Sequence, residues 1–183
     1  MNSSISPKAD IHPNAWINPQ NVTIEEGVMI GPFCTIGLTG ITVEKELFVI
    51  GDNVLQKCQG TVLIKKDAKI TGHTMVGLGF KKDGCTYIGK SVIIGPQCVI
   101  SHDSYIGDNS ILVSRIGVSG YVKIGKGCWI GPGVTISNRV EIGDGASVSL
   151  GSVVTQNVEK GKRVTGNFAI DHDKFIGNLK KMR

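Results

Sequence analysis

Residues 88–111 read IGKSVIIGPQCVISHDSYIGDNSI, and an isoleucine returns every six residues, at 88, 94, 100 and 106. The same step runs through much of the chain. From Ile64 to Val154 there are sixteen positions six residues apart, and only Lys82 among them is not Ile, Leu or Val. A period of six fits neither a helix, at 3.6, nor a simple strand, at 2. It predicts a short strand followed by a turn, repeated many times.

A second row of positions lies four residues after each member of the first. Most of its side chains are small or β-branched, as a cramped, inward-facing position requires. The row consists of Ala68, Thr74, Phe80, Thr86, Val92, Cys98, Ser104, Ser110, Ile116, Val122, Cys128, Val134, Val140, Ala146, Ser152 and Val158.

Every third repeat is alike. IGKS, IGDN, IGKG and IGDG begin at 88, 106, 124 and 142, three hexads apart, whereas IGPQ and IGPG begin at 94 and 130. Three strands per coil make a triangular prism, with like residues stacked at the strand spacing of roughly 4.8 Å. Each coil buries its inner face only against its neighbours, as in a solenoid.

The IG-[KD]-x and IGP-x hexads from 88 to 154 resemble those of the hexapeptide-repeat acyltransferases, which are left-handed parallel β-helices. The left hand comes from this resemblance. The likeness extends through less regular hexads at Ile24, Ile30, Ile36 and Ile50. The steps from 36 to 50 and from 50 to 64 are longer than one hexad and predict short insertions. We therefore expect an all-β fold, with a left-handed β-helix acyltransferase domain over 1–160 and a C-terminal extension over 161–183.

The composition fits a narrow aliphatic core. Of the 183 residues 40% are hydrophobic but only 5% are aromatic. No apolar run reaches the roughly 18 residues that a membrane span needs, and the amino terminus lacks the profile of a signal peptide. A cytoplasmic location is the expectation. The five cysteines form no CxxC pair and are odd in number, so we expect reduced thiols rather than disulfides or a zinc ribbon.

The formal charge of +5 is concentrated at the carboxyl end. Residues 160–183 hold seven Lys or Arg and two Asp, whereas the rest of the chain balances. The basic segment is either a solvated end or a site for phosphates or an acidic carrier protein. Nucleic acid is disfavoured, because no aromatic residues alternate with the basic ones for base stacking.

The last residues, DHDKFIGNLKKMR, predict a short amphipathic helix. Phe175, Leu179 and Met182 would share one face, Asp171 would cap the amino end, and Lys180, Lys181 and Arg183 would suit the carboxyl end. The helix either covers the open end of the prism or, as the resemblance implies, supports trimer contacts and donor binding.

His102 lies two residues after Ile100, within the most regular repeats. Counting by three hexads, we expect Gly84 before it and Gly120 after it in the same column, with Asn138 beyond. Two glycines would leave open surface around the imidazole, and Gly120 would offer a backbone N–H. A base beside such a donor suits acyl transfer. The alternative is an ordinary exposed polar residue on a solenoid.

The sequence ISHDSYIGD around His102 resembles the xxHxxxIGD context of the general base in these acyltransferases. It is most similar to the lipid A glucosamine N-acyltransferase and to the bacterial amino-sugar N-acetyltransferases. The resemblance implies that His102 is the base and that Gly120 holds the oxyanion. Asp103 would orient the imidazole. Arg139 stands where the lipid A enzyme has a second histidine, and that enzyme also carries an amino-terminal nucleotide-sugar domain, so we expect class membership rather than identity.

The implied reaction moves an acyl group, acetyl first of all, from acyl-CoA or acyl carrier protein to the amine or hydroxyl of a nucleotide-linked sugar or amino sugar. No metal and no tightly bound cofactor is required. Asn138, Arg139 and Arg163 are candidates for contacting the donor's phosphates. The family's trimers, with active sites between subunits, lead us to expect a homotrimer.

Other interpretations remain open. Cys85 could be a covalent nucleophile, although the other repeat cysteines belong to the inward row. The stretch VGLGFKKDGCTY at 76–87 is either a loop lining the site or a distorted coil. A γ-type carbonic anhydrase needs three converging histidines, but His12, His73, His102 and His172 are scattered. A non-catalytic scaffold or binding subunit is the remaining alternative.

Overall fold

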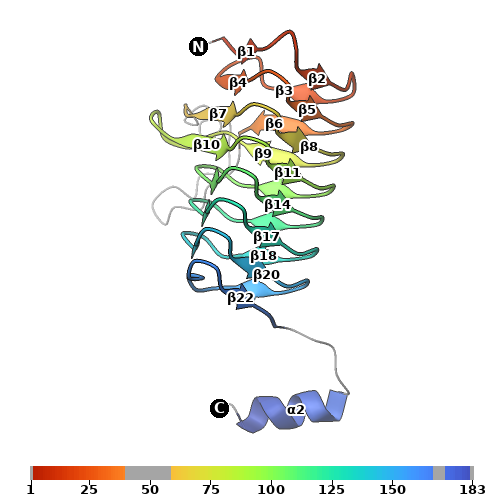
Figure 1. The fold of residues 1–183 in the computed structure, drawn as a ribbon, viewed down its shortest axis with the longest axis vertical. Helices are drawn as coiled ribbons and strands as arrows, with labels where there is room; N and C mark the ends of the chain where they lie inside the picture. Colours follow the sequence, from red (N-terminus) through yellow and green to blue (C-terminus); the bar gives the residue numbers. More distant parts are fainter. Residues whose placement is uncertain (1, 40–58, 167–171, 182–183) are drawn as a thin grey trace, which may run out of the picture.

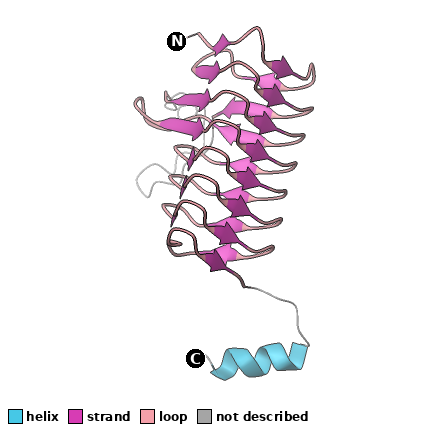
Figure 2. Ribbon diagram, viewed as in Figure 1, coloured by secondary structure: helices cyan, strands magenta, loops and turns pink. Residues whose placement is uncertain are grey.

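The computed structural model describes residues 2–39, 59–166 and 172–181. Within them, three parallel sheets of seven, eight and seven strands form the sides of a prism. Figure 1 shows the coils stacked in chain order, from β1 at one end to β22 at the other. Figure 2 shows strands on every coil and a helix near the carboxyl terminus. The expected parallel β-helix is confirmed.

The first sheet contains β1 (Ser4–Ile5), β4 (Val22–Ile24), β7 (Thr61–Ile64), β10 (Cys85–Ile88), β13 (Tyr105–Ile106), β16 (Lys123–Ile124) and β19 (Glu141–Ile142). The second contains β2 (Asp10–Ile11), β5 (Met29–Ile30), β8 (Lys69–Ile70), β11 (Ile93–Ile94), β14 (Ile111–Leu112), β17 (Trp129–Ile130), β20 (Ser147–Val148) and β22 (Arg163–Val164). The third contains β3 (Trp16–Ile17), β6 (Thr35–Leu38), β9 (Met75–Gly77), β12 (Val99–Ile100), β15 (Gly117–Val118), β18 (Thr135–Ile136) and β21 (Val153–Val154).

The strand register follows the repeat. In the first sheet Ile88 pairs with Ile106, and Ile106 pairs with Ile124, so each step to the next coil is three hexads. Two-residue strands suffice because every coil uses the coils above and below it as its sheet neighbours. The predicted prism with three strands per coil is therefore confirmed over the regular repeats.

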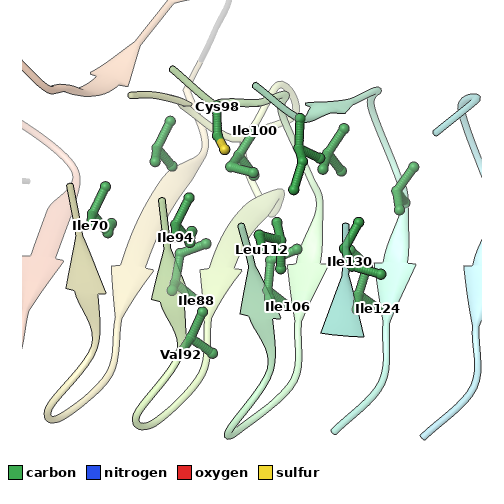
Figure 3. Packing of buried hydrophobic residues seen from close by; sticks show 14 of the residues in the cluster. Ile70, Ile88, Val92, Ile94, Cys98, Ile100, Ile106, Leu112, Ile124 and Ile130 are labelled. Carbon is green, nitrogen blue, oxygen red and sulfur yellow. The ribbon is translucent and has the colours of Figure 1, made fainter. Parts of the chain in front are cut away.

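Both predicted inward rows form the core in the regular coils, whereas Phe80 of the second row is buried in the connection between β9 and β10. Every aliphatic member of the first row and all sixteen members of the second are buried. Figure 3 shows Ile94, Leu112 and Ile130 among the side chains that stack along the prism. Several polar members of the second row bond to the backbone: the Thr74 hydroxyl donates to Gly95 O at 2.9 Å and the Ser104 hydroxyl to Ser119 O at 3.0 Å. Small polar side chains therefore serve the corners, where carbonyls turn inward. The Ser152 hydroxyl is buried without a hydrogen-bond partner among the described residues.

The early repeats are interrupted between Ile36 and Ile64. Ile24 pairs directly with Ile64, so Ile64 is the next inward position around the prism after Ile36. A step that elsewhere takes one hexad here runs from 36 to 64. The expectation that Ile50 marks a hexad of its own falls outside the described residues.

A second insertion leaves the six-residue spacing of the sequence unchanged. Val76 of β9 and Ile88 of β10 occupy successive sides of the prism although they are two hexads apart. Lys82 lies exposed in the intervening turn. Because the insertion is one hexad long, counting by sixes passes through it without a break. The residues 78–84, which we call the inserted loop, therefore add length but no side to the prism.

This insertion corrects the expected neighbour of His102. Ile100 pairs with Val76, so the column position one coil earlier belongs to Leu78 and not to Gly84. The position one coil later is Gly120, as expected, because Ile100 also pairs with Val118. The prediction was wrong on the side where the inserted loop breaks the count of three hexads per coil.

The carboxyl end contains β22 and the helix α2 (His172–Lys181). β22 lies in the segment 161–183 and pairs with β20. The helix is present where it was expected, with Lys180 and Lys181 in its last turn. Asp171, Met182 and Arg183 lie outside the described residues, as do the side chains of Phe175 and Leu179. No helix within the described ranges is long and apolar enough to cross a membrane.

Candidate active site

His102 lies at the corner where the chain leaves β12 of the third sheet and enters β13 of the first. The corner is anchored from both sides, because Ile100 and Ser104 are buried. The imidazole itself is 18% exposed. It is therefore held by the prism while keeping access to solvent.

Asp103 is the direct partner of the imidazole. Its Oδ2 lies 2.9 Å from His102 Nδ1, and the carboxylate is 9% exposed. The same oxygen accepts the Phe80 N–H at 3.0 Å, while the Asp103 N–H donates to Thr86 Oγ1 at 2.9 Å. A carboxylate only accepts hydrogen bonds, so the neutral imidazole carries its proton on Nδ1. This leaves the Nε2 lone pair free to take a proton.

Gly120 lies against the other edge of the ring. A Cβ built on Gly120 would lie 2.7 Å from both Cε1 and Nε2 of His102. Only glycine therefore allows the imidazole to lie in this position. The Gly120 carbonyl accepts the Arg139 N–H at 3.1 Å, whereas among the described residues no backbone bond uses the Gly120 N–H as donor. The described backbone does not use that N–H, and Gly120 lies against the Nε2 edge of the ring.

Two aromatic rings flank His102, so the open surface expected around it is not observed. The Tyr121 ring meets the imidazole edge-on, with 5.0 Å between ring centroids, and the Phe80 ring is tilted at 5.9 Å. Tyr121 could have been found from the sequence, because it follows Asp103 by three hexads, which is one regular coil. Phe80 could not, since the inserted loop brings it to the corner from outside the regular register.

The three residues expected to contact the donor are not all at this corner. Arg139 stacks its guanidinium on the Tyr121 ring, 4.7 Å from the centroid. Asn138 precedes it, and its Oδ1 accepts a long hydrogen bond of 3.5 Å from the Ser137 hydroxyl. Arg163 lies on β22 of the second sheet, where its Nε donates to Ser149 Oγ at 3.3 Å. Within one chain, Arg163 is thus placed on a different side of the prism.

The cysteines have the surroundings of core residues. Cys34, Cys98 and Cys128 are buried and free, and burial raises the pKa of each thiol. Their inward position is confirmed. Cys85 is half-buried in β10, with its Sγ 3.6 Å from the carbonyl of Thr86. Cys58 lies outside the described residues.

The other three described histidines lie elsewhere, and His172 is the first residue of α2. The His73 ring stacks on Phe33 with 5.0 Å between centroids, and His12 Nδ1 accepts the Asn14 N–H at 3.1 Å. Both lie at corners between the second and third sheets. Across the described ranges, no three His, Cys, Asp or Glu side chains form a group that could hold a metal ion.

The repeats match a known family model. Residues 85–115 and 121–156 match the bacterial transferase hexapeptide model, which consists of six repeats. The search of curated proteins found no match.

Solved structures of similar shape cover nearly the whole chain. UDP-N-acetylglucosamine acyltransferase from Campylobacter jejuni matches with a TM-score of 0.67 and 21% identity over 97% of this chain and 82% of its own. LpxA from Acinetobacter baumannii matches with a TM-score of 0.61 and 22% identity, over 98% of this chain and 76% of its own. The Arabidopsis UDP-N-acetylglucosamine acyltransferase matches with a TM-score of 0.61 and 19% identity, over 97% of this chain and 79% of its own. At these identities the likeness establishes the fold. The expected resemblance is confirmed: the chain carries bacterial transferase hexapeptide repeats, folded into a left-handed parallel β-helix.

Proposed function

We propose that the protein transfers an acyl group directly from a thioester to the amine or hydroxyl of a sugar, with His102 as general base. The observation that carries the proposal is the pair of contacts on the imidazole. Asp103 holds Nδ1 at 2.9 Å, and Gly120 lies against Nε2 with its N–H unused by the described backbone. This arrangement would supply a base and an oxyanion donor side by side.

The proposed reaction proceeds in two steps. Nε2 of His102 removes the proton of the acceptor amine or hydroxyl as its nitrogen or oxygen forms a bond to the thioester carbonyl carbon. The carbonyl π electrons move to oxygen, giving a tetrahedral oxyanion. When this collapses, the carbon–sulfur bond breaks, and the leaving thiolate takes the proton from the imidazolium. The products are an amide or ester and a free thiol, and the histidine is neutral again.

Gly120 and Asp103 have separate tasks in this scheme. The Gly120 N–H would bind the oxyanion, a contact worth roughly 3 kcal/mol in comparable sites. Asp103 would keep the imidazole in the tautomer with a free Nε2 and would stabilise the imidazolium that forms. Holding donor and acceptor together at the corner would supply much of the remaining acceleration.

The proposed substrates follow from charge and from the shape of the fold. Arg139 stacks on the Tyr121 ring, which in turn meets the His102 imidazole. With Asn138 it would contact phosphates of the donor, acetyl-CoA or another acyl-CoA, or acyl carrier protein. Two of the structures of similar fold, from Campylobacter jejuni and Arabidopsis, are enzymes named for UDP-N-acetylglucosamine, which supports a nucleotide-linked sugar or amino sugar as acceptor. Such a product fits a role in polysaccharide biosynthesis.

The test is thiol release by the purified protein from acetyl-CoA, longer acyl-CoAs and acyl carrier protein, each against a panel of nucleotide-linked sugars and amino sugars. Mass spectrometry of the acceptor identifies the product and distinguishes an amide from an ester. We expect thiol release that depends on one acceptor, with one acyl group added per thiol formed. A folded protein that releases no thiol from any donor would contradict the proposal and favour a non-catalytic scaffold.

A further inference from the structure

We propose that the inserted loop 78–84 positions His102, and that it acts through the carboxylate of Asp103. The inference rests on the proposed function, because it concerns the group that would remove the acceptor's proton. Among the described residues, this loop is the place beside His102 where the regular coil of three hexads is lengthened. Phe80 and Gly84 are then positioning residues, and neither touches the reacting atoms.

A single oxygen connects the loop to the imidazole. Asp103 Oδ2 accepts the backbone N–H of Phe80 at 3.0 Å and also lies 2.9 Å from His102 Nδ1. The Phe80 N–H therefore fixes the direction in which the carboxylate meets the ring. At a regular corner a carboxylate can accept a backbone N–H from the preceding coil, as Asp108 does from Lys90 at 2.9 Å. At the His102 corner the inserted loop supplies this donor.

The other carboxylate oxygen is held by the far end of the loop. A Cβ on Gly84 would overlap Asp103 Oδ1. Glycine at 84 thus leaves the space that the carboxylate occupies. Because Phe80 contacts one oxygen and Gly84 the other, the loop determines both the position and the rotation of the carboxylate.

The loop itself is fixed to the prism by close backbone contacts. Leu78 N–H donates to Leu38 O at 2.8 Å, and Thr61 N–H donates to Gly84 O at 2.9 Å. Added Cβ atoms on Gly60 or Gly79 would overlap the Gly84 carbonyl. Three glycines therefore let the two ends of the loop and the start of β7 pack backbone to backbone. This packing makes the loop a rigid support rather than a flexible cover.

The decisive variant is Gly84→Ala, which displaces the carboxylate without altering His102 or Asp103. Its backbone does not require a left-handed φ, so the main strain is the contact of the new methyl group with the carboxylate and with Lys81. Gly117→Ala is the matched control, because its added Cβ would have no contact closer than 3.8 Å, to Thr135. Thermal unfolding establishes that both variants are folded.

The first readout is the tautomer of His102 in protein labelled with ¹⁵N-histidine, and it needs no catalysis. In the wild type and in Gly117→Ala we expect the proton on Nδ1. In Gly84→Ala we expect a shift toward the form with the proton on Nε2, which free imidazole favours. Phe80→Leu keeps the backbone N–H and should leave the tautomer unchanged. An unchanged tautomer in folded Gly84→Ala would overturn the proposal. An equal shift in Phe80→Leu would transfer the role to the ring and overturn the assignment to the N–H.

The second readout is kinetic. Gly84→Ala should lower kcat about tenfold or more with little change in the KM of the donor, as expected for a misplaced base. In an Asp103→Ala background it should cause no further loss, because the carboxylate that it displaces is absent. If Gly84→Ala lowered kcat in the Asp103→Ala background as much as in the wild type, the loop would act through a group other than the Asp103 carboxylate. If the wild type transfers no acyl group while the tautomer still shifts, the proposed function fails and the positioning contact stands.

Discussion

At the scale of single residues, the pairing of His102 with Asp103 depends on the conformation of the corner. Side chains that are adjacent along a strand point to opposite faces, so neighbours in sequence seldom meet. At this corner Asp103 has a φ of 55°, in the left-handed region that non-glycine residues seldom adopt. The turn brings both side chains together at 2.9 Å. Tyr121 and Arg139, with φ of 60° and 63°, repeat the conformation on the next two coils.

Asp103→Ala should slow acyl transfer while leaving the fold intact. Loss of the carboxylate frees Nδ1, so the imidazole can place its proton on Nε2 and cease to act as a base. We expect kcat to fall by about tenfold or more, up to the roughly 10²- to 10⁴-fold that general base catalysis contributes. Steady-state kinetics at saturating donor measures this. Asp10→Ala, at an exposed position far from the corner in sequence, is the control and should retain full activity.

Gly127→Ala tests the cost of the corner conformation by itself. Gly127 has a φ of +62°, and a Cβ added to it would meet no atom within 4 Å. Any loss of stability must then come from the backbone, and we expect about 1 kcal/mol. Gly117→Ala, with no left-handed φ, should be neutral or slightly stabilising. Urea unfolding of both variants decides the matter, and equal stabilities would show that the corners tolerate a side chain freely.

At the scale of elements, the sequence predicts the regular coils well because two rows of inward side chains repeat without exception after Ile88. It predicts the irregular coils poorly for a physical reason. An insertion in a solenoid can leave the prism at a corner and return to it without changing the packing of the core. Its residues then show no regular hydrophobic pattern in the sequence. The inserted loop also lengthens the connection by one hexad, so the spacing of aliphatic residues was preserved although Gly84 was displaced from its expected column.

The corner between the first and second sheets is held by ion pairs between coils. Lys8 and Lys66 both contact Glu26, at 3.2 and 2.7 Å, and Lys65 pairs with Glu25. The hydrogen bond from Lys65 lowers the pKa of Glu25, and the bonds from Lys66 and Lys8 lower that of Glu26. These contacts join coils on both sides of the insertion between Ile36 and Ile64, where the chain itself makes no short connection.

The lowered pKa values predict how stability depends on pH. A carboxyl group whose folded pKa lies below its ordinary value, 4.5 here, stabilises the fold above that value. The contribution is lost as the pH falls through the lowered folded pKa. We therefore expect Glu25→Gln to reduce the free energy of unfolding at pH 7 and to converge with the wild type in acid below the folded pKa. A difference that persists unchanged in acid would contradict the ion-pair account.

At the scale of the whole molecule, the prism leaves large apolar side chains on its outer faces. Ile93, Ile111 and Trp129 follow one another on the second sheet, each about 40% exposed. A row of such residues favours association with another chain. We propose a homotrimer, for which sedimentation should give three times the 19.5 kDa of one chain. A mass of one chain at micromolar concentration would contradict it.

A shared site would explain why Arg163 lies away from His102 within one chain. If Arg163 contacts a donor bound at another subunit's corner, co-refolding two impaired variants, His102→Ala and Arg163→Ala, should form some sites with both residues native and recover activity. The matched pair is His102→Ala with Gly120→Ala, which should recover none because both residues belong to the same corner. Equal recovery in the two mixtures would exclude the shared arrangement.

If His102 removes the acceptor's proton, replacing it should lower kcat, measured at saturating donor and acceptor for His102→Gln beside the wild type. Glutamine keeps a polar side chain at the corner but cannot act as a base near neutral pH. His73→Gln, at a corner between the second and third sheets, is the control. We predict a fall of roughly 10²-fold or more for His102→Gln alone. Equal kcat values for the wild type and His102→Gln would remove His102 from the chemistry and contradict the account.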